Sequence, residues 1–373
     1  VYLDNAATTP IDSEVITIIN NVMTEAFGNP SSTHQFGRKA KSIVEEARKS
    51  IAKQFNVTAG EVFFTSGGSE ADNLILKNAV DNLGVTHIIT SKIEHHAVLH
   101  TIEALVNEFP IKVSYVSIDN GQVDYNDLEK LLAKNTDKTL VSLMHINNEL
   151  GIILDIQKVS ELCKKYKVLF HSDTVQTIGH FTLNLQKTPI DFITASAHKF
   201  HGPKGVGFAI IKKENKIKPL LIGGEQERGV RAGTENVHNI AGMHKAIEIA
   251  YGNLERDKAY IADLKHYFIE GLRAIDANIK FNGYSDNLKK SSYIILNVRF
   301  GKSIPMLLFN LDLKGIAASG GSACQSGSNK GSHVLNAILS EADAKKTSVR
   351  FSFSKFITKK DLDYTLDILK TLV

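Results

Sequence analysis

The sequence predicts an α/β protein: a large domain with a mostly parallel sheet covered by helices, and a smaller C-terminal α/β domain. Three observations support this. Over the first two-thirds of the chain, short apolar runs alternate with patterns of helical period, which is typical of repeated β-then-α units. These runs are apolar throughout, as strands buried on both faces require. After Gly223 a polar, Gly-rich loop precedes long helical stretches and a mixed tail.

The expected elements follow in a regular order. Residues 38–55 place Ile43, Ala47 and Ile51 on one helical face. We expect strands at 62–65, 87–91, 112–118, 139–146, 168–173, 191–197 and 205–212. Residues 66–80 are expected to form a turn that opens a helix, and further helices are expected at 96–109, 125–134 and 155–166. Past the loop 222–236, we expect helices over 237–275, strands in 293–300 and 348–354, and helices at 302–312, 332–339 and 359–372. We place the domains at 15–255 and 256–373, joined by the N-terminal segment 1–14.

Composition excludes several classes of protein. A net charge of +4 over 373 residues gives no argument for a nucleic-acid partner. Two cysteines cannot form a disulfide framework or a four-thiolate zinc site, so we predict no metal. No apolar run approaches the roughly 20 residues of a membrane helix, and residues 1–10 do not resemble a signal peptide. We therefore expect a cytoplasmic protein without a membrane partner.

Polar residues gather at the carboxyl ends of the expected strands, the edge where doubly wound sheets bind ligands. The turn 66–73 feeds a helix, and its free N–H groups form a potential phosphate cradle. Alone, such a turn is equally typical of ordinary capping. His95 follows the next strand and could stack on an aromatic ring or move a proton, although a lone histidine there is more often structural. Asn147 and Asn148 could donate to a ligand oxygen or cap the following helix.

Two further strand ends carry charged residues. Asp173 ends a buried strand and needs a cationic partner, a role that a protonated pyridine nitrogen could fill. Lys199 follows the strand 191–197; it could reach the surface or, deprotonated, form a Schiff base. Together, a phosphate cradle, a stacking imidazole, an acid for a ring nitrogen and a Schiff-base lysine are the contributions that a protein makes to pyridoxal phosphate chemistry.

With these residues in place, the sequence resembles the NifS/IscS-type cysteine desulfurases, which are class-V aminotransferase-like, fold-type-I enzymes that depend on pyridoxal 5'-phosphate. The similarity runs from YLDNAATTP (2–10) through FGNPSSTH (27–34) to SVRFSFS (348–354), and so covers nearly the whole chain. The resemblance implies removal of sulfur from L-cysteine, which gives L-alanine and a persulfide on Cys324. It also implies a homodimer and a sulfur-acceptor protein such as an iron–sulfur scaffold.

The resemblance also implies roles for individual residues. Lys199 would carry the cofactor and remove the substrate's α-proton, and His95 would stack on the ring. The other cofactor contacts would come from Ser69, the backbone around Glu70, Asn148, Asp173, Gln176, Ser196 and His198, with Thr234 reaching the phosphate of the neighbouring subunit. Asn148 and Arg350 would hold the substrate carboxylate, with Asn29 as a further candidate.

Cys324 decides the predicted reaction. It lies in the Gly- and Ser-rich segment 318–332, a composition typical of a mobile loop. Cys163 lies on a helical pattern and is expected to be a buried apolar residue. The catalytic role therefore falls on Cys324.

Three departures from the family pattern stand out. Thr174 replaces the usual alanine after Asp173 and is expected to pack against the cofactor ring opposite His95. Glu225 replaces a usual glycine, and its carboxylate would be unfavourable near a phosphate. The chain ends at Val373, soon after the last expected helix, where longer relatives continue toward a scaffold partner.

Two alternatives remain at this point. The chain could be a selenocysteine lyase or another aminotransferase-like enzyme in which Cys324 is incidental. It could also be a catalytically silent sulfur carrier or assembly partner that keeps the fold.

Overall fold

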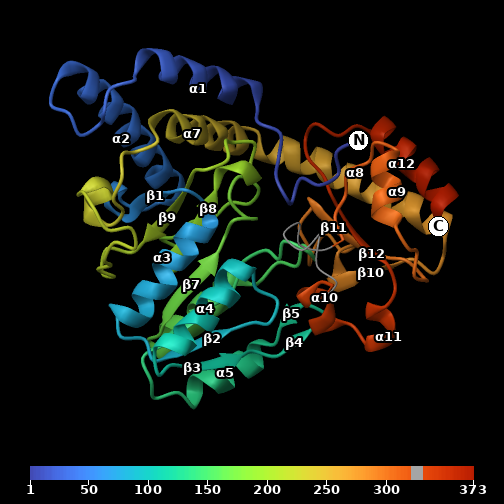
Figure 1. Cartoon of the computed structure of the whole chain (residues 1–373). Helices are drawn as coiled ribbons and strands as arrows, with labels where there is room; N and C mark the ends of the chain where they lie inside the picture. The colour runs from blue at the N-terminus through green and yellow to red at the C-terminus, as the bar shows by residue number, and fades with distance from the viewer. Residues whose placement is uncertain (321–330) are drawn as a thin grey trace.

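The computed structural model describes residues 1–320 and 331–373. Its main feature is a seven-stranded sheet, shown in Figure 1. In spatial order the strands are β1 (Val62–Thr65), β9 (Gly207–Ile211), β8 (Phe192–Ser196), β7 (Leu169–Asp173), β6 (Thr139–Ser142), β2 (His87–Thr90) and β3 (Lys112–Tyr115). β9 runs antiparallel to both neighbours, and the other pairs are parallel. The prediction of an α/β fold with a mostly parallel sheet is confirmed.

The strands of the large sheet are four or five residues long. β1, β2, β6, β8 and β9 are buried at every position, which explains why their sequences are mostly apolar, apart from buried His, Thr and Ser residues. β3 is an edge strand with exposed ends, so the expectation that every strand is buried on both faces is wrong there. The predicted strand 139–146 ends at Ser142, although Leu143 and His145 still donate to β7 carbonyls.

Helices cover both faces of this sheet. Those of the first 252 residues are α1 (Ser13–Glu25), α2 (Gln35–Phe55), α3 (Gly68–Asp81), α4 (His96–Glu108), α5 (Tyr125–Ala133), α6 (Ile156–Tyr166) and α7 (Val237–Gly252). Two apolar cores result. One packs α2, α6 and α7 against the sheet, and the other packs α3 and α4 against it. A small hairpin, β4 (Ile118–Asp119) and β5 (Gln122–Val123), precedes α5.

A separate apolar core lies around a three-stranded antiparallel sheet of β10 (Lys280–Phe281), β11 (Ile295–Arg299) and β12 (Ser348–Ser352). It is packed by α8 (Leu254–Ile275), α9 (Leu307–Leu313) and α12 (Lys359–Leu372). α10 (His333–Ile338), which precedes α11 (Glu341–Ala344), packs instead in a small cluster with Leu150 and Ile152. Leu3 and Ala6 belong to the same core, and Figure 1 shows the N-terminus beside α8 and α12. The domain boundary at residue 255 stays a prediction.

The segment after β6 and the segment before β11 meet in a buried seam between the two parts of the fold. Ser292 N donates to Gly151 O at 2.7 Å, and Ile152 bridges to Ser291. Beneath this seam the fully buried Lys265 donates from Nζ to Ser292 O at 2.7 Å and to Ser291 Oγ at 3.1 Å. Burial lowers the pKa of Lys265 to about 7.

We expect Lys265 to make stability depend on alkaline pH. Because its folded pKa lies below its ordinary value of 10.5, the unfolded chain binds more protons between pH 7 and 10.5, and the free energy of unfolding rises over that range. The rise attributable to this group is on the order of 3–5 kcal/mol. Denaturant unfolding measured from pH 7 to 10 should show that the free energy of unfolding of Lys265→Met rises less steeply with pH than that of the parent protein. An unchanged slope would contradict the assignment.

Candidate active site

A cavity of about 230 Å³ opens at the carboxyl ends of β6, β7 and β8. Its lining joins residues from the sheet, from α3 and α4, from the N-terminal segment and from β12. The lining residues are Ala6, Ala7, Gly68, Ser69, Asp72, His95, Met144, Asn148, Asp173, Val175, Gln176, Ser196, His198, Lys199 and Arg350. The structure thus brings together residues predicted from separate strand ends.

The N-terminal segment positions Lys199. The lysine ends a short 3₁₀ turn after β8, and its Nζ donates to Ala6 O at 2.7 Å and Ala7 O at 2.8 Å. Gln176 Nε2 also donates to Ala6 O, at 3.0 Å. These contacts hold the amine at the wall of the cavity, where it can react with a carbonyl group.

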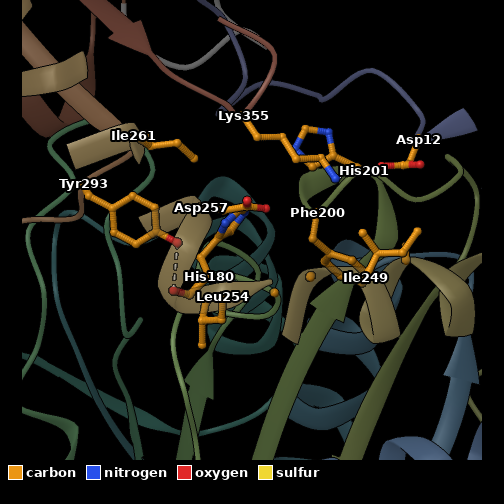
Figure 2. Close-up of a pocket in the computed structure, with 13 residues that line it drawn as sticks. Asp12, His180, Phe200, His201, Ile249, Leu254, Asp257, Ile261, Tyr293 and Lys355 are labelled. Atoms are coloured by element: carbon orange, nitrogen blue, oxygen red, sulfur yellow. Dashed lines mark hydrogen bonds and ion pairs between the residues drawn. The ribbon is translucent and has the colours of Figure 1, made fainter. Parts of the chain in front are cut away.

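A small second cavity of about 20 Å³, enough for one water molecule, lies behind Lys199. Figure 2 shows His180, His201 and Tyr293 around it, together with Asp12 and Lys355. His180 Nε2 lies 2.9 Å from Lys199 O, and the Tyr293 hydroxyl donates to His180 O at 2.9 Å. This cavity is too small for an amino-acid substrate. Its side chains support the backbone that carries Lys199.

Two buried carboxyl groups lie on the floor of the main cavity. Asp173 ends β7, and its Oδ1 accepts from Val175 N at 2.9 Å. Burial, and secondarily the neighbouring Asp72, raise the pKa of Asp173 to about 7. Burial also raises the pKa of Asp72 to about 7; its Oδ1 lies 3.3 Å from His171 Nε2. A cation bound beside Asp173 would relieve this cost.

Asp72 was absent from the sequence prediction. It lies three residues after Ser69 in α3, and this spacing places the two side chains on the same side of the helix. That periodicity is the signal that could have identified it.

Replacing Asp173 should stabilise the protein without cofactor while impairing catalysis. The raised pKa of Asp173 means that its contribution to stability is present below its ordinary value of 3.8 and is lost as pH rises through about 7. Asp173→Asn lacks this loss. Above pH 7 the free energy of unfolding of the cofactor-free variant should therefore exceed that of the cofactor-free parent protein by an amount on the order of 2–4 kcal/mol. Turnover should fall roughly 10²–10³-fold. Equal pH profiles of unfolding for the two proteins would refute this prediction.

The start of α3 forms the anion-binding end of the site. Gly67 caps the helix with a φ of 152°, and a Cβ on Gly68 would lie 2.6 Å from Val175 Cγ2. Ser69 and Ser196 line the same wall. A glycine-lined helix start with unpaired N–H groups fits a phosphate. Glu70 contributes only backbone here, because its carboxylate accepts from Arg231 and from Ser66 N instead.

His95 and His198 are both neutral near pH 7. Burial, followed by the charge of Lys199, lowers the pKa of each to about 4. His95 caps α4, and its Nδ1 accepts from Ala97 N at 3.1 Å, which places the proton of the neutral ring on Nε2. His198 Nδ1 lies 3.1 Å from Thr8 Oγ1. Both rings can therefore stack on a ligand without adding positive charge, and each neutral ring still carries one N–H that can donate a hydrogen bond.

Arg350 forms the opposite wall. It is 1% exposed, and it donates from Nη1 to Asn148 O at 2.8 Å and from Nη2 to Asp4 Oδ1 at 2.9 Å. Its buried Nε has no hydrogen-bond partner among the described residues. An unsatisfied guanidinium donor in a cavity wall suits a carboxylate ligand.

Several predicted residues lie elsewhere. Asn29 is exposed, and its Oδ1 accepts from Ser31 N at 2.9 Å. Thr234 and Glu225 are exposed and do not line the cavity. Cys324 lies outside the described residues.

The expectation for Thr174 is wrong. Its side chain is buried away from the cavity and donates to Thr194 O at 2.7 Å. Val175 lines the cavity instead. Cys163 is 2% exposed in the core on α6, where burial raises the pKa of its thiol far above the ordinary value. Such a thiol is inert.

Comparison with known proteins decides the family. The sequence pattern of the aminotransferase class-V family matches residues 1–365. The chain belongs to the class-V aminotransferase family. The predicted resemblance to this family, and to its NifS/IscS-type members, is confirmed.

Individual relatives and solved structures are similar to this class-V chain over nearly its whole length. "Cysteine desulfurase IscS" of Dictyoglomus turgidum is 43% identical over 380 residues, which cover 100% of this chain and 94% of that protein. A solved "NifS-like protein" has a TM-score of 0.91 at 37% identity, with 100% of this chain and 98% of that one covered. A structure described as "SspA in complex with cysteine" has a TM-score of 0.83 at 29% identity, covering 96% and 99%.

Proposed function

We propose that this class-V chain is a cysteine desulfurase that converts L-cysteine to L-alanine and leaves the sulfur as a persulfide on Cys324. The observation that carries the proposal is one cavity in which Lys199, the buried Asp173 and the buried Arg350 face the same space. Relatives at 37–43% identity are named for this activity, and they align over the whole chain.

We propose pyridoxal 5'-phosphate as the cofactor, because the donor set fits it. The helix start at Gly68 and Ser69, with Ser196 and His198, would hold the phosphate. Asp173, whose burial is costly without a cation, would pair with the ring nitrogen. Lys199 would bind the aldehyde carbon. When bound, this cofactor withdraws electrons from the substrate's α-carbon.

The chain's own side chains would then perform the remaining tasks. Arg350 and Asn148 would orient the substrate carboxylate by hydrogen bonds. The Lys199 amine would take the α-proton, and neutral His95 could hold or return a proton at Nε2. The Cys324 thiolate would attack the substrate sulfur, so that an S–S bond forms as the substrate's C–S bond breaks and the carbon retains the electron pair. Protonation of that carbon completes alanine, and no external oxidant is needed.

The assembly and the sulfur acceptor also belong to this proposal. Thr234 is exposed on a loop beside the start of α3, a position from which it could reach the phosphate of a second copy. We propose a homodimer on this basis. A protein acceptor such as an iron–sulfur scaffold would receive the persulfide sulfur. A cytoplasmic location would keep the thiol reduced between turnovers. No helix in the described part of the chain is long and apolar enough to cross a membrane.

The Cys324→Ala variant tests the assigned nucleophile. It should lose sulfide release from L-cysteine while keeping the absorbance band of the bound cofactor, because Lys199 and the cavity are untouched. Cys163→Ala is the matched control: it removes the other cysteine, and sulfide release should continue. Sulfide release that survives in Cys324→Ala would show that the nucleophile is wrongly assigned and would favour another lyase chemistry.

A further inference from the structure

The loop 222–236 carries Thr234 past the edge of the large sheet. Two hydrogen bonds close the loop on itself: Ala232 N donates to Leu221 O at 3.3 Å, and Gly233 N donates to Gln226 Oε1 at 3.1 Å. Two ion pairs, described below, tie it to α2 and α3.

The first pair joins Arg48 of α2 to Glu227 of the loop. Arg48 Nη1 donates to Glu227 Oε2 at 2.7 Å and Nη2 donates to Oε1 at 2.8 Å, in a two-pronged arrangement. The side chains are only 3% and 2% exposed. Breaking such a buried pair from one side leaves an uncompensated charge.

The side chains of this pair also form hydrogen bonds with the backbone at the edge of the sheet. β1 lies at the edge of the sheet, so among the described residues no strand pairs with its outward Val62 O and Phe64 N. Arg48 Nη1 donates to Val62 O, and Phe64 N donates to Glu227 Oε2, both at 2.8 Å. The loop is thereby fixed to the strand that leads directly into the turn at the start of α3.

The loop backbone is strained at the same place. Glu227 and Arg228 both adopt left-handed conformations, with φ of 46° and 58°. Consecutive non-glycine residues rarely do so, and they persist only where surrounding contacts over-determine them. The buried carboxylate of Glu227 supplies those contacts. Strain held in this way is typical of positions that must be placed accurately.

The second pair connects the loop to the proposed phosphate site. Arg231 Nε donates to Glu70 Oε1 at 3.0 Å, and Glu70 Oε2 accepts from Ser66 N at 2.8 Å. Glu70 lies in the first turn of α3, next to Ser69. Thr234 follows three residues after Arg231 and is exposed, and its hydroxyl has no hydrogen bond to any described residue.

We propose that the pairs Arg48–Glu227 and Arg231–Glu70 act as positioning residues that fix the loop so that Thr234 reaches the cofactor phosphate of a second copy of this chain. The inference rests on the proposed homodimer. It adds that accurate placement of Thr234 comes from the buried Glu227 and from Arg231, within the donating subunit.

A double-mutant cycle tests the inference through cofactor affinity. The dissociation constant of pyridoxal 5'-phosphate would be measured by equilibrium dialysis on cofactor-free Glu227→Gln, Thr234→Ala and the double variant, with oligomeric state from light scattering. Each single variant should weaken binding about 10–100-fold, the value of one charged hydrogen bond, while staying dimeric. The double variant should be no weaker than the worse single variant, since both remove the same contact.

Controls separate the possible outcomes. Arg228→Gln removes a half-exposed charge from the same strained turn and should leave the affinity unchanged. Arg231→Gln, on the more exposed pair, provides a second cycle if Glu227→Gln does not fold. Additive losses, or unchanged affinity in both Glu227→Gln and Arg231→Gln, would overturn the positioning role alone. Unchanged affinity in Thr234→Ala would overturn the proposed Thr234 contact, and a monomeric parent protein would overturn the dimer proposal; either result overturns this inference.

Discussion

Lys199→Ala should abolish desulfuration, with turnover falling by roughly 10⁴-fold or more. The substitution removes both the attachment point of the cofactor and the amine that takes the α-proton. The structure holds that amine on Ala6 O and Ala7 O, in the wall of the cavity, where a shorter side chain cannot reach the substrate. Sulfide release and the absorbance band of the bound cofactor should disappear together.

Lys204→Ala is the matched control. It removes an exposed lysine five residues away, on the same segment, and should change neither signal. A Lys199→Ala protein that still shows the band and releases sulfide would contradict the assignment of the reactive lysine. Absence of the band in the freshly purified parent protein would favour the catalytically silent alternative.

Arg350→Lys should raise the KM for L-cysteine by roughly 10–100-fold with a smaller effect on kcat. Lysine keeps the charge but loses the planar fork and the buried Nε donor, which has no hydrogen-bond partner among the described residues. Loss of one charged hydrogen bond is worth about 1.5–3 kcal/mol. The free energy of unfolding of the variant should also fall by about 1–3 kcal/mol, because Asn148 O and Asp4 lose a buried hydrogen-bond partner.

Arg299→Lys on the neighbouring strand β11 is the control, because it makes the same substitution of arginine by lysine outside the cavity. Arg299 pairs with Asp343 away from the cavity, so KM should not change. Steady-state kinetics with cysteine measure both variants. If Arg350→Lys retains the parent KM, the substrate carboxylate binds elsewhere, and Asn148 becomes the candidate to examine.

The sequence predicted the sheet well because its strands are buried. β1 was predicted at 62–65 and observed at Val62–Thr65, since a fully buried strand is rich in apolar residues; here only its last residue, Thr65, is polar. Element ends were less predictable. The helix expected from residue 302 begins at Leu307, because Met306 adopts a left-handed conformation directly after Pro305. Such a backbone choice is set by tertiary packing and leaves no periodic trace.

The active-site residues that the sequence identified share one property: they follow strands whose ends meet at one edge. Lys199, Asp173 and His95 were found in this way, and all three line the cavity. Side-chain direction within a turn was not predictable. Thr174 turns into the core while Val175 faces the cavity, because the Thr174 hydroxyl finds a carbonyl on β8.

Residues that act between elements far apart in the chain left no local signal. The pair of Arg48 and Glu227 spans 179 positions and becomes visible only when β1 lies at the sheet edge. The resemblance to the family supplied Arg350 and Gln176, which no periodicity would have selected.

One measurement tests the central proposal most directly. The purified protein, loaded with pyridoxal 5'-phosphate, would be incubated with L-cysteine and an excess of dithiothreitol, and alanine and sulfide would be quantified in the same samples over time. A cysteine desulfurase that regenerates its thiol produces the two in equal amounts over many turnovers. Alanine without sulfide, or sulfide with pyruvate in place of alanine, would contradict the proposed reaction.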